Sequence, residues 1–231
     1  MDDTFDSLLG GEMSPYRERY RRDLLELRVD VDKLVGQVDL AVGKSVEALR
    51  DYNLDKAREV ISGDQLVDEL NLKIEKSCME LLALQQPMAK DLRLIIGILK
   101  IGVELERIGD LAVDIARIVI HSKNKVHVKS LNNIPRMAAI SRNMLSDAVK
   151  ALDERDADLA RQTTKWDYEI DALYEKVRDT LFRIIAGNTN LIDDALPLLL
   201  ANRHLERIGD HVCNICESII YMVEAKREHL N

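Results

Sequence analysis

Acidic side chains recur at intervals of four residues along this chain. Glu106, Asp110 and Asp114 form one series, and Asp64 with Asp68 forms another. Residues four apart lie on one face of an α-helix, so each series would be a stripe of carboxylates. Like charges at this spacing destabilise an isolated helix by about 0.2–0.5 kcal/mol per pair. The stripes therefore favour binding of a compensating cation.

Both stripes occur a second time further along the chain. Asp167 and Asp171 repeat the shorter stripe, and Glu206 and Asp210 repeat the longer one. If the two stripes of a copy face each other, their hard oxygen donors suit Mg²⁺, Mn²⁺, Ca²⁺ or iron better than a metal that seeks thiolates. We expect these nine carboxylates to be metal ligands. Ligand type leaves the ion open among iron, Zn, Mg, Mn and Ca.

A competing interpretation needs no metal. Arg107 and Arg207 lie within the same segments and could neutralise the carboxylates as surface or inter-helix salt bridges. Such pairs could also coexist with bound metal. Because both stripes recur in both copies, the sequence favours metal binding over pairing alone.

Motifs of several enzyme classes are missing from the sequence. Ferritin-like di-iron enzymes use Glu-x-x-His on paired helices, and this chain contains no Glu-x-x-His. It also lacks a G-x-x-x-x-G-K-[ST] phosphate loop, a G-x-S-x-G elbow and an H-E-x-x-H zinc motif. We therefore expect a protein that is not an enzyme.

A C-x-x-C pair, Cys213 and Cys216, lies inside an expected helix without a β-α-β context. The corresponding residues of the first copy are Val113 and Ala116, which favours small buried core residues over redox or zinc chemistry.

Two histidines, His204 and His211, flank the second long stripe. Either could join a metal, although a satisfied or exposed histidine is the commoner case.

The recurrence of the stripes belongs to an internal duplication. The sequence LERIGD occurs at residues 105–110 and again at 205–210 and contains the start of each long stripe, while the Asp-x-x-x-Asp stripes are offset by 103 positions. The second copy is thus three residues shorter between the motifs, near the turn that joins the second and third helices. The chain is therefore two copies of a three-helix unit, each a bundle of antiparallel neighbours.

Helical periodicity and helix-start signals define the expected elements. In the first copy we expect helices over about 15–52, 53–86 and 88–121, and in the second over about 135–153, 156–186 and from 190 onward. The apolar positions of the first helix recur at three- and four-residue steps: Leu24, Leu27, Val31, Leu34, Val38, Val42, Val46 and Leu49. The expected organisation is all-α, with a flexible leader (1–14), a first repeat (15–121), a linker (122–133) and a second repeat (134–231).

Composition limits the partners and the compartment. The 231 residues carry a formal net charge of −8, so no overall positive field exists to hold nucleic acid. The strongest apolar run, 92–103, is interrupted by charges and is far shorter than the ~20 residues that span a bilayer. No secretory signal is visible, and three cysteines fit a reducing compartment. We expect a cytoplasmic protein without direct membrane insertion.

LERIGD in both halves, Asp-x-x-x-Asp on the preceding helix and QQPMAKDLR over residues 85–93 resemble the PhoU family across nearly the whole chain after the leader. The resemblance implies two tandem three-helix bundles related by a pseudo-twofold axis, a homodimer, and metal clusters on the acidic faces. The implied ligands are Asp64, Asp68, Glu106, Asp110 and Asp114 in the first copy and Asp167, Asp171, Glu206 and Asp210 in the second.

The resemblance also implies a function. PhoU-like proteins couple the ATPase subunit of a phosphate ABC transporter to a sensor histidine kinase and repress the phosphate-starvation response. The second copy departs from the pattern, because Asn214 replaces the acid at Asp114 and the Gln-Gln-Pro stretch is lost. Two alternatives stay open: a carboxylate-metal enzyme of the phosphohydrolase type, and a metal-free helical adaptor.

Overall fold

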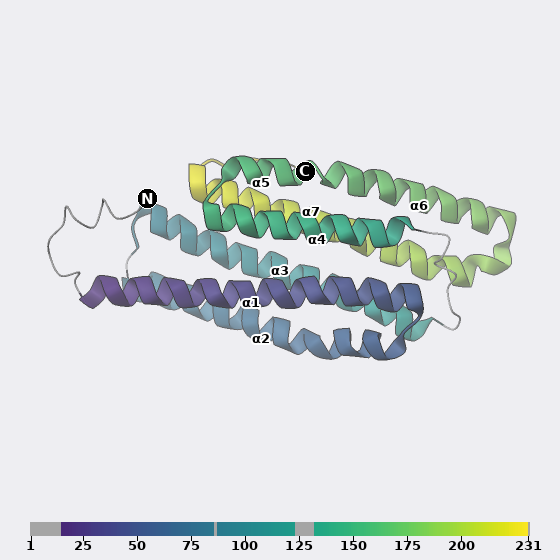
Figure 1. Ribbon diagram of the computed structural model, residues 1–231, viewed down its shortest axis with the longest axis horizontal. Coiled ribbons are helices and arrows are strands. Elements are labelled where there is room, and N and C mark those ends of the chain that lie inside the picture. Colours follow the sequence, from purple (N-terminus) through teal and green to yellow (C-terminus); the bar gives the residue numbers. More distant parts are fainter. Residues whose placement is uncertain (1–14, 86, 123–131, 231) are drawn as a thin grey trace.

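The structure of this chain is a computed structural model that describes residues 15–85, 87–122 and 132–230. Within these ranges it consists of α-helices and one short 3₁₀ helix, with no strand. The long helices run side by side along the long axis of the molecule (Figure 1). The all-α fold predicted from the sequence is confirmed.

The helices fall into two sets that follow each other along the chain. The first set is α1 (Pro15–Asp51), α2 (Leu54–Gln85) and α3 (Ala89–His121). The second set is α4 (Asn133–Glu154), α5 (Ala157–Thr164), α6 (Asp167–Gly187), η3 (Thr189–Leu191) and α7 (Ile192–Glu224).

The apolar face of α1 shows why the first helix packs as it does. Leu27, Val31, Leu34, Val38, Val42, Val46 and Leu49 are all buried, and Leu24 is partly buried against them. Their spacing keeps one stripe of the helix facing its neighbours, which are α2, α3 and α4. The core face predicted for the first helix is confirmed.

The link between the first and second helices has the same conformation and the same kind of cap in both copies. Tyr52 after α1 and Arg155 after α4 both adopt a left-handed conformation, with φ of 52° and 53°. The next residue then caps the following helix: Asn53 Oδ1 accepts from the Lys56 amide at 2.9 Å, and Asp156 Oδ1 accepts from Leu159 at 2.9 Å. The equivalence of these corners shows that the duplication extends to local backbone geometry.

The prediction of one uninterrupted helix over 156–186 is wrong. The chain tightens at residues 165–166, where the amides of Lys165 and Trp166 bond three residues back at 3.2 Å each. The preceding Thr163 and Thr164 hydroxyls donate to backbone carbonyls of their own helix, which competes with regular helical bonding. The break separates α5 from α6 and makes Asp167 the first residue of α6.

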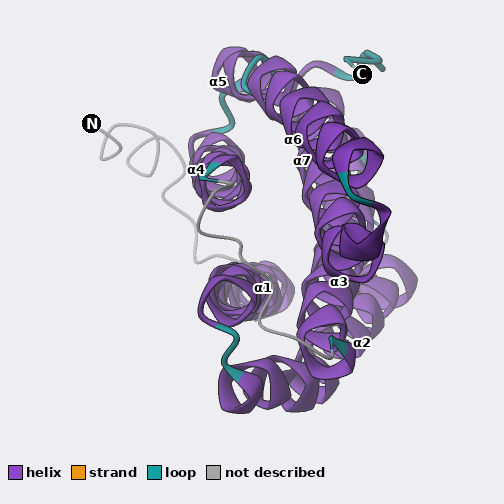
Figure 2. Cartoon of the chain, turned by 90° about the vertical axis from the view of Figure 1, so that its right-hand side faces the viewer, coloured by secondary structure: helices purple, strands orange, loops and turns teal. Residues whose placement is uncertain are grey.

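The two helix sets pack through their third helices. Within the first set α1, α2 and α3 contact one another, and in the second α7 contacts α4, α5 and α6. Between the sets, α3 packs along α7 and α1 packs along α4 (Figure 2). The buried apolar residues form one continuous cluster across both sets. Two tandem bundles with pseudo-twofold symmetry, as predicted, are therefore joined by a shared core.

The expected leader (1–14) and most of the expected linker (122–133) lie outside the described residues. In the part of the chain that the structure describes, no helix combines the length and apolar character needed to cross a membrane.

Candidate metal-binding faces

In the first repeat, the two acidic stripes come from neighbouring helices. Asp64 and Asp68 lie on α2, and Glu106, Asp110 and Asp114 lie on α3, which packs along α2. Burial raises the pKa of Asp64, and the charges of Asp68 and Asp110 raise it further. Burial likewise raises the pKa of Glu106, with the Asp110 charge adding to it. The carboxylates of the two helices therefore share one negative field.

Arginines partly neutralise this first face. The Arg107 guanidinium lies 3.5 Å from Glu106 and 3.1 Å from Asp110, and Arg117 lies 3.0 Å from Asp114. Both arginines are about half exposed, so these pairs are worth at most about 1 kcal/mol each. The predicted pairing by Arg107 is thus present, but the pKa values of neighbouring acids stay raised.

In the second repeat, Asp167 and Asp171 of α6 face Glu206 and Asp210 of α7. Asp167 is only 4% exposed, and burial, followed by the charges of Asp171 and Asp210, raises its pKa to about 7. Burial and Asp210 also raise the pKa values of Asp171 and Glu206. The second face holds its carboxylates in a less hydrated setting than the first, because the counterpart Asp64 is half-buried.

A glycine on α7 lets Asp167 approach so closely. A methyl group added at Gly209 would lie 2.5 Å from Asp167 Oδ1, which is closer than atoms in contact allow. At the equivalent Gly109 of α3, the nearest atom to such a methyl group is a Val67 side-chain carbon at 3.1 Å. The glycine of LERIGD is therefore needed for close packing of the acidic helices. In the second copy the Asp167 carboxylate occupies the space beside this glycine.

The donor set of these faces fits a hard cation. Within the described ranges, no group of three or more His, Cys, Asp or Glu side chains is arranged to hold a metal ion. Carboxylates repel one another, so a cation is needed to draw them into one coordination sphere. Two buried oxygens of the second face, Asp167 Oδ1 and Glu206 Oε2, have no hydrogen-bond partner. Such orphaned acceptors are costly unless something binds them.

Arginine pairing in the second face differs from the prediction. The guanidinium that pairs with Glu206 is that of Arg203, one turn before it, whereas Arg207 was the expected partner. Asn202, which extends the acidic row, is fully buried and donates to the Tyr174 carbonyl at 3.0 Å. In the first copy the same position is Gly102, and the polar group comes instead from Asn71 of α2.

One histidine lies between the repeats and not in an acidic face. His211 Nδ1 lies 2.7 Å from Glu104 Oε2, and Asn214 donates to the same oxygen at 3.1 Å. Burial acts to raise the pKa of Glu104, but the bonds from His211 and Asn214 outweigh it and hold that pKa below the usual range. These contacts join α3 to α7. Sequence reasoning missed Glu104, because its partners are more than 100 residues away.

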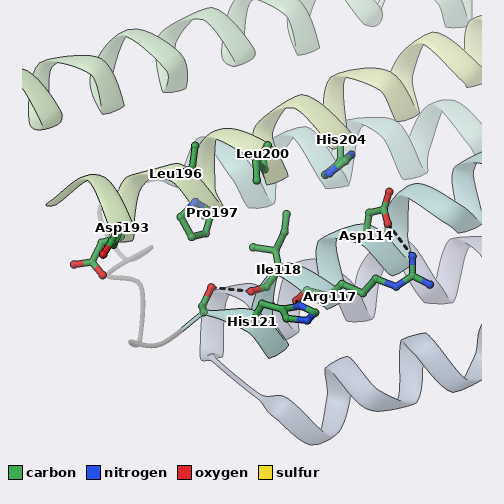
Figure 3. Close-up of a pocket in the computed structure, with 11 residues that line it drawn as sticks. Asp114, Arg117, Ile118, His121, Asp193, Leu196, Pro197, Leu200 and His204 are labelled. Carbon is green, nitrogen blue, oxygen red and sulfur yellow. Dashed lines mark hydrogen bonds and ion pairs between the residues drawn. The ribbon is translucent and has the colours of Figure 1, made fainter.

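The other histidine lines a cavity of about 490 Å³ between the C-terminal half of α3 and the N-terminal half of α7, hereafter the α3–α7 cavity. Figure 3 shows Asp114, Arg117 and His121 on its α3 side and Asp193 and His204 on its α7 side, with apolar residues between them. His204 Nδ1 is buried without a hydrogen-bond partner, and burial lowers the pKa of His204. No sequence motif marks this cavity, because its walls come from both repeats.

Cys213 contacts the second face, because its thiol hydrogen-bonds to the Asp167 carboxylate. Cys78, Cys213 and Cys216 are free and fully buried. Burial raises all three pKa values, to about 12 for Cys78 and Cys216, so the thiols stay protonated. The interpretation of the C-x-x-C pair as core residues is confirmed.

Comparison with known proteins identifies similar chains of the same size. The family model described as "PhoU domain" matches residues 31–119 and 134–219. A Thermotoga maritima protein named "Phosphate-specific transport system accessory protein PhoU homolog 1" is 37% identical over 209 residues, which are 90% of each chain. The Escherichia coli "Phosphate-specific transport system accessory protein PhoU" is 31% identical, covering 90% of this chain and 86% of its own length.

Solved structures show the same fold. The crystal structure of PhoU from Pseudomonas aeruginosa superposes with a TM-score of 0.82 at 32% identity, over 90% of this chain and all of that one. The phosphate transport system regulatory protein PhoU from Streptococcus pneumoniae superposes with a TM-score of 0.85 at 27% identity, over 91% of this chain and all of that one.

Proposed function

This chain belongs to the PhoU family, and we propose that it is an accessory regulator of a phosphate transport system. The observation that carries the proposal is the match of the family's domain to both repeats, together with relatives named as phosphate-specific transport accessory proteins that align along 90% of the chain. Function does not follow from fold alone, but these relatives share the full duplicated architecture.

The proposed regulator works by binding partners in the cytoplasm. It couples the ATPase subunit of a phosphate ABC transporter to a sensor histidine kinase, and represses phosphate-starvation genes when phosphate is plentiful. A homodimer is the proposed assembly. The long helices support this role, because α2 leaves the large apolar side chains of Leu66, Leu72 and Met79 about half exposed or more. Apolar surface of this kind suits docking to another protein.

Metal binding is the second part of the proposal. Asp64, Asp68, Glu106, Asp110 and Asp114 would hold a cation in the first repeat, and Asp167, Asp171, Glu206 and Asp210 in the second. A cation such as Mg²⁺, Mn²⁺, Ca²⁺, iron or zinc would supply positive charge that joins the two acidic helices of each repeat. The orphaned oxygens of Asp167 and Glu206 support the second site in particular.

The partner proposal is tested by affinity capture. The full chain with a C-terminal tag is recovered from its own cells at high and at low phosphate, after crosslinking, and the retained proteins are identified by mass spectrometry. Recovery of a transporter ATPase or a membrane histidine kinase supports the proposal. Recovery of neither at either phosphate level contradicts it.

An enzymatic role is the second candidate, and the orphaned carboxylate oxygens of Asp167 and Glu206 are the observation that favours it, because a metal held there could activate a water for attack on a phosphate ester. Metal-loaded protein is assayed for phosphate-ester hydrolysis with and without chelator. Turnover that chelator and Asp167→Asn both abolish would establish the enzyme.

A further inference from the structure

A second cavity occupies the position that is related to the α3–α7 cavity by the internal duplication. It lies at the opposite end of the α3–α7 pair, where α3 begins and α7 ends, and has a volume of about 210 Å³. Its polar lining consists of Lys90, Asp91, Arg93 and Arg155, and its apolar walls include Leu94 and Met222. We call it the basic pocket.

The two related cavities carry opposite charge. Arg93 of the basic pocket occupies the position that Asp193 takes in the α3–α7 cavity, 100 residues later. Arg155 occupies the corner position that Tyr52 takes in the first copy, and the Tyr52 hydroxyl donates to the carbonyl of Ser122 beside the α3–α7 cavity. The equivalent positions at the α3–α7 cavity carry no cation. The shared fold therefore does not explain why the basic pocket has cations.

Within the described ranges, the cations of the basic pocket have no acid bound to them. No ion pair within 4.0 Å there involves Lys90, Arg93 or Arg155, and Arg93 Nε is buried with no hydrogen-bond partner among the described residues. A buried guanidinium nitrogen without an acceptor is costly. Among the residues that the structure describes, none supplies an acceptor for this nitrogen.

Nearby acids do not meet this need. Asp91 lies beside the Tyr20 hydroxyl, where burial and then the Asp91 charge raise the pKa of Tyr20 to about 12. At the end of α7, Glu224 and Glu228 are both bound by Arg161. The C-terminal ends of α4 and α7 add partial negative charge. These partial charges and the Asp91 carboxylate together are smaller than the three full positive charges of the pocket.

The start of α3 adds donors to the same place. The carbonyl of its N-cap residue, Met88, accepts from the Asp91 amide at 2.8 Å, but Met88 makes no side-chain capping bond to the amides of Ala89 and Lys90. Lys90 and Arg93 lie in the first two turns of this helix, within the QQPMAKDLR segment that the second copy lacks.

We propose that the basic pocket binds a small oxyanion of the phosphate type, held by Lys90, Arg93 and Arg155. Arginine presents a planar fork of donors that matches two phosphate oxygens, and lysine adds a point charge. The pocket volume of about 210 Å³ has room for a small oxyanion. The site would make the regulator itself responsive to phosphate, and to that extent it rests on the proposed function.

Binding is measured on the isolated, chelator-treated full chain, so that metal at the acidic faces cannot bind the anion. Inorganic phosphate is titrated by calorimetry at low ionic strength, with chloride as the ionic-strength control. The methyl resonance of Met222, assigned in methyl-labelled protein, reports whether the ion enters the pocket. Arg93→Gln and Arg155→Gln are the test variants, and Lys100→Gln on the exposed face of α3 is the matched control.

We expect saturable binding of one phosphate with a shift of the Met222 methyl resonance. Each test variant should bind at least about tenfold more weakly, the loss of one charge-assisted hydrogen bond, while Lys100→Gln binds as the unchanged protein does. Absence of saturable binding, equal weakening in Lys100→Gln, or a methyl resonance that does not move would overturn the site. Binding only to vesicles that contain phosphatidic acid would overturn the free ion as the ligand. Partner capture is a separate experiment, so failure here leaves the regulatory proposal standing.

Discussion

Replacing Asp167 with asparagine should stabilise the metal-free protein, and more so at alkaline than at acid pH. Burial and the neighbouring carboxylates raise the pKa of Asp167 to about 7 from an ordinary value of 3.8. The native state therefore holds the proton more tightly than the unfolded state does. The cost of ionising Asp167 in the native state is small below about pH 4 and grows until the pH passes about 7.

The size of this cost follows from the shift. At pH 8 it is roughly 4 kcal/mol, and at pH 5, where the native carboxyl is protonated, it falls to roughly 1.5 kcal/mol. Any cost of burying the asparagine amide is the same at both values and cancels in the comparison. The variant should therefore gain about 2.5 kcal/mol more at pH 8 than at pH 5, or roughly 5–10 °C in Tm for a chain of this length.

Thermal unfolding in chelator at the two pH values measures the difference, with Asp64→Asn as the matched control. Asp64 is the equivalent residue of the first repeat, but it is half-buried and should show a smaller dependence on pH. A gain for Asp167→Asn that is equal at pH 5 and pH 8 would contradict the raised pKa of Asp167, and so would an equal pH dependence in the control.

Three further predictions concern packing, charge and metal. Gly209→Ala should destabilise the protein by about 1–3 kcal/mol, because its methyl group displaces the Asp167 carboxylate. Gly36→Ala, whose methyl group meets no atom within 4 Å, should be neutral or stabilise the protein by up to about 1 kcal/mol. Urea unfolding measures the stability of both variants. Asp30 is 3% exposed, and although burial acts to raise its pKa, the ammonium groups of Lys73 and Lys33 hold that pKa below its usual range. Asp30→Asn should therefore cost about 1–3 kcal/mol of stability at pH 7, and progressively less as acid protonates the native carboxyl. Replacing Glu106 and Asp110 together with alanine should lower the bound metal per chain, measured by elemental analysis, with helix content by circular dichroism unchanged; unaltered metal content would remove these residues from the site.

Much of the fold could be predicted because it follows from local periodicity and from the internal repeat. The apolar stripe of α1 and the caps at Asn53 and Asp156 depend on residues close in sequence. The break before Asp167 was missed, because two threonine hydroxyls that bond back to their own helix leave no apolar pattern to detect.

The candidate site was only partly accessible from sequence. Spacing alone places the carboxylates on helix faces, and the structure brings the faces of each repeat into one electrostatic field. The bond between His211 and Glu104 depends on packing between distant segments, so it has no signature in a single helix. The pairing of Glu206 is local, because Arg203 and Arg207 both lie within reach of it on α7 and spacing alone does not choose between them.

The most direct test of the regulatory role is made in cells that lack this chain. Phosphate uptake and expression of phosphate-starvation genes are measured in phosphate-rich medium, with and without a plasmid copy of the full chain. We expect both to rise in the deletion strain and to return to the parental level with the plasmid copy. Unchanged uptake and unchanged starvation-gene expression in the deletion strain would contradict the regulatory role.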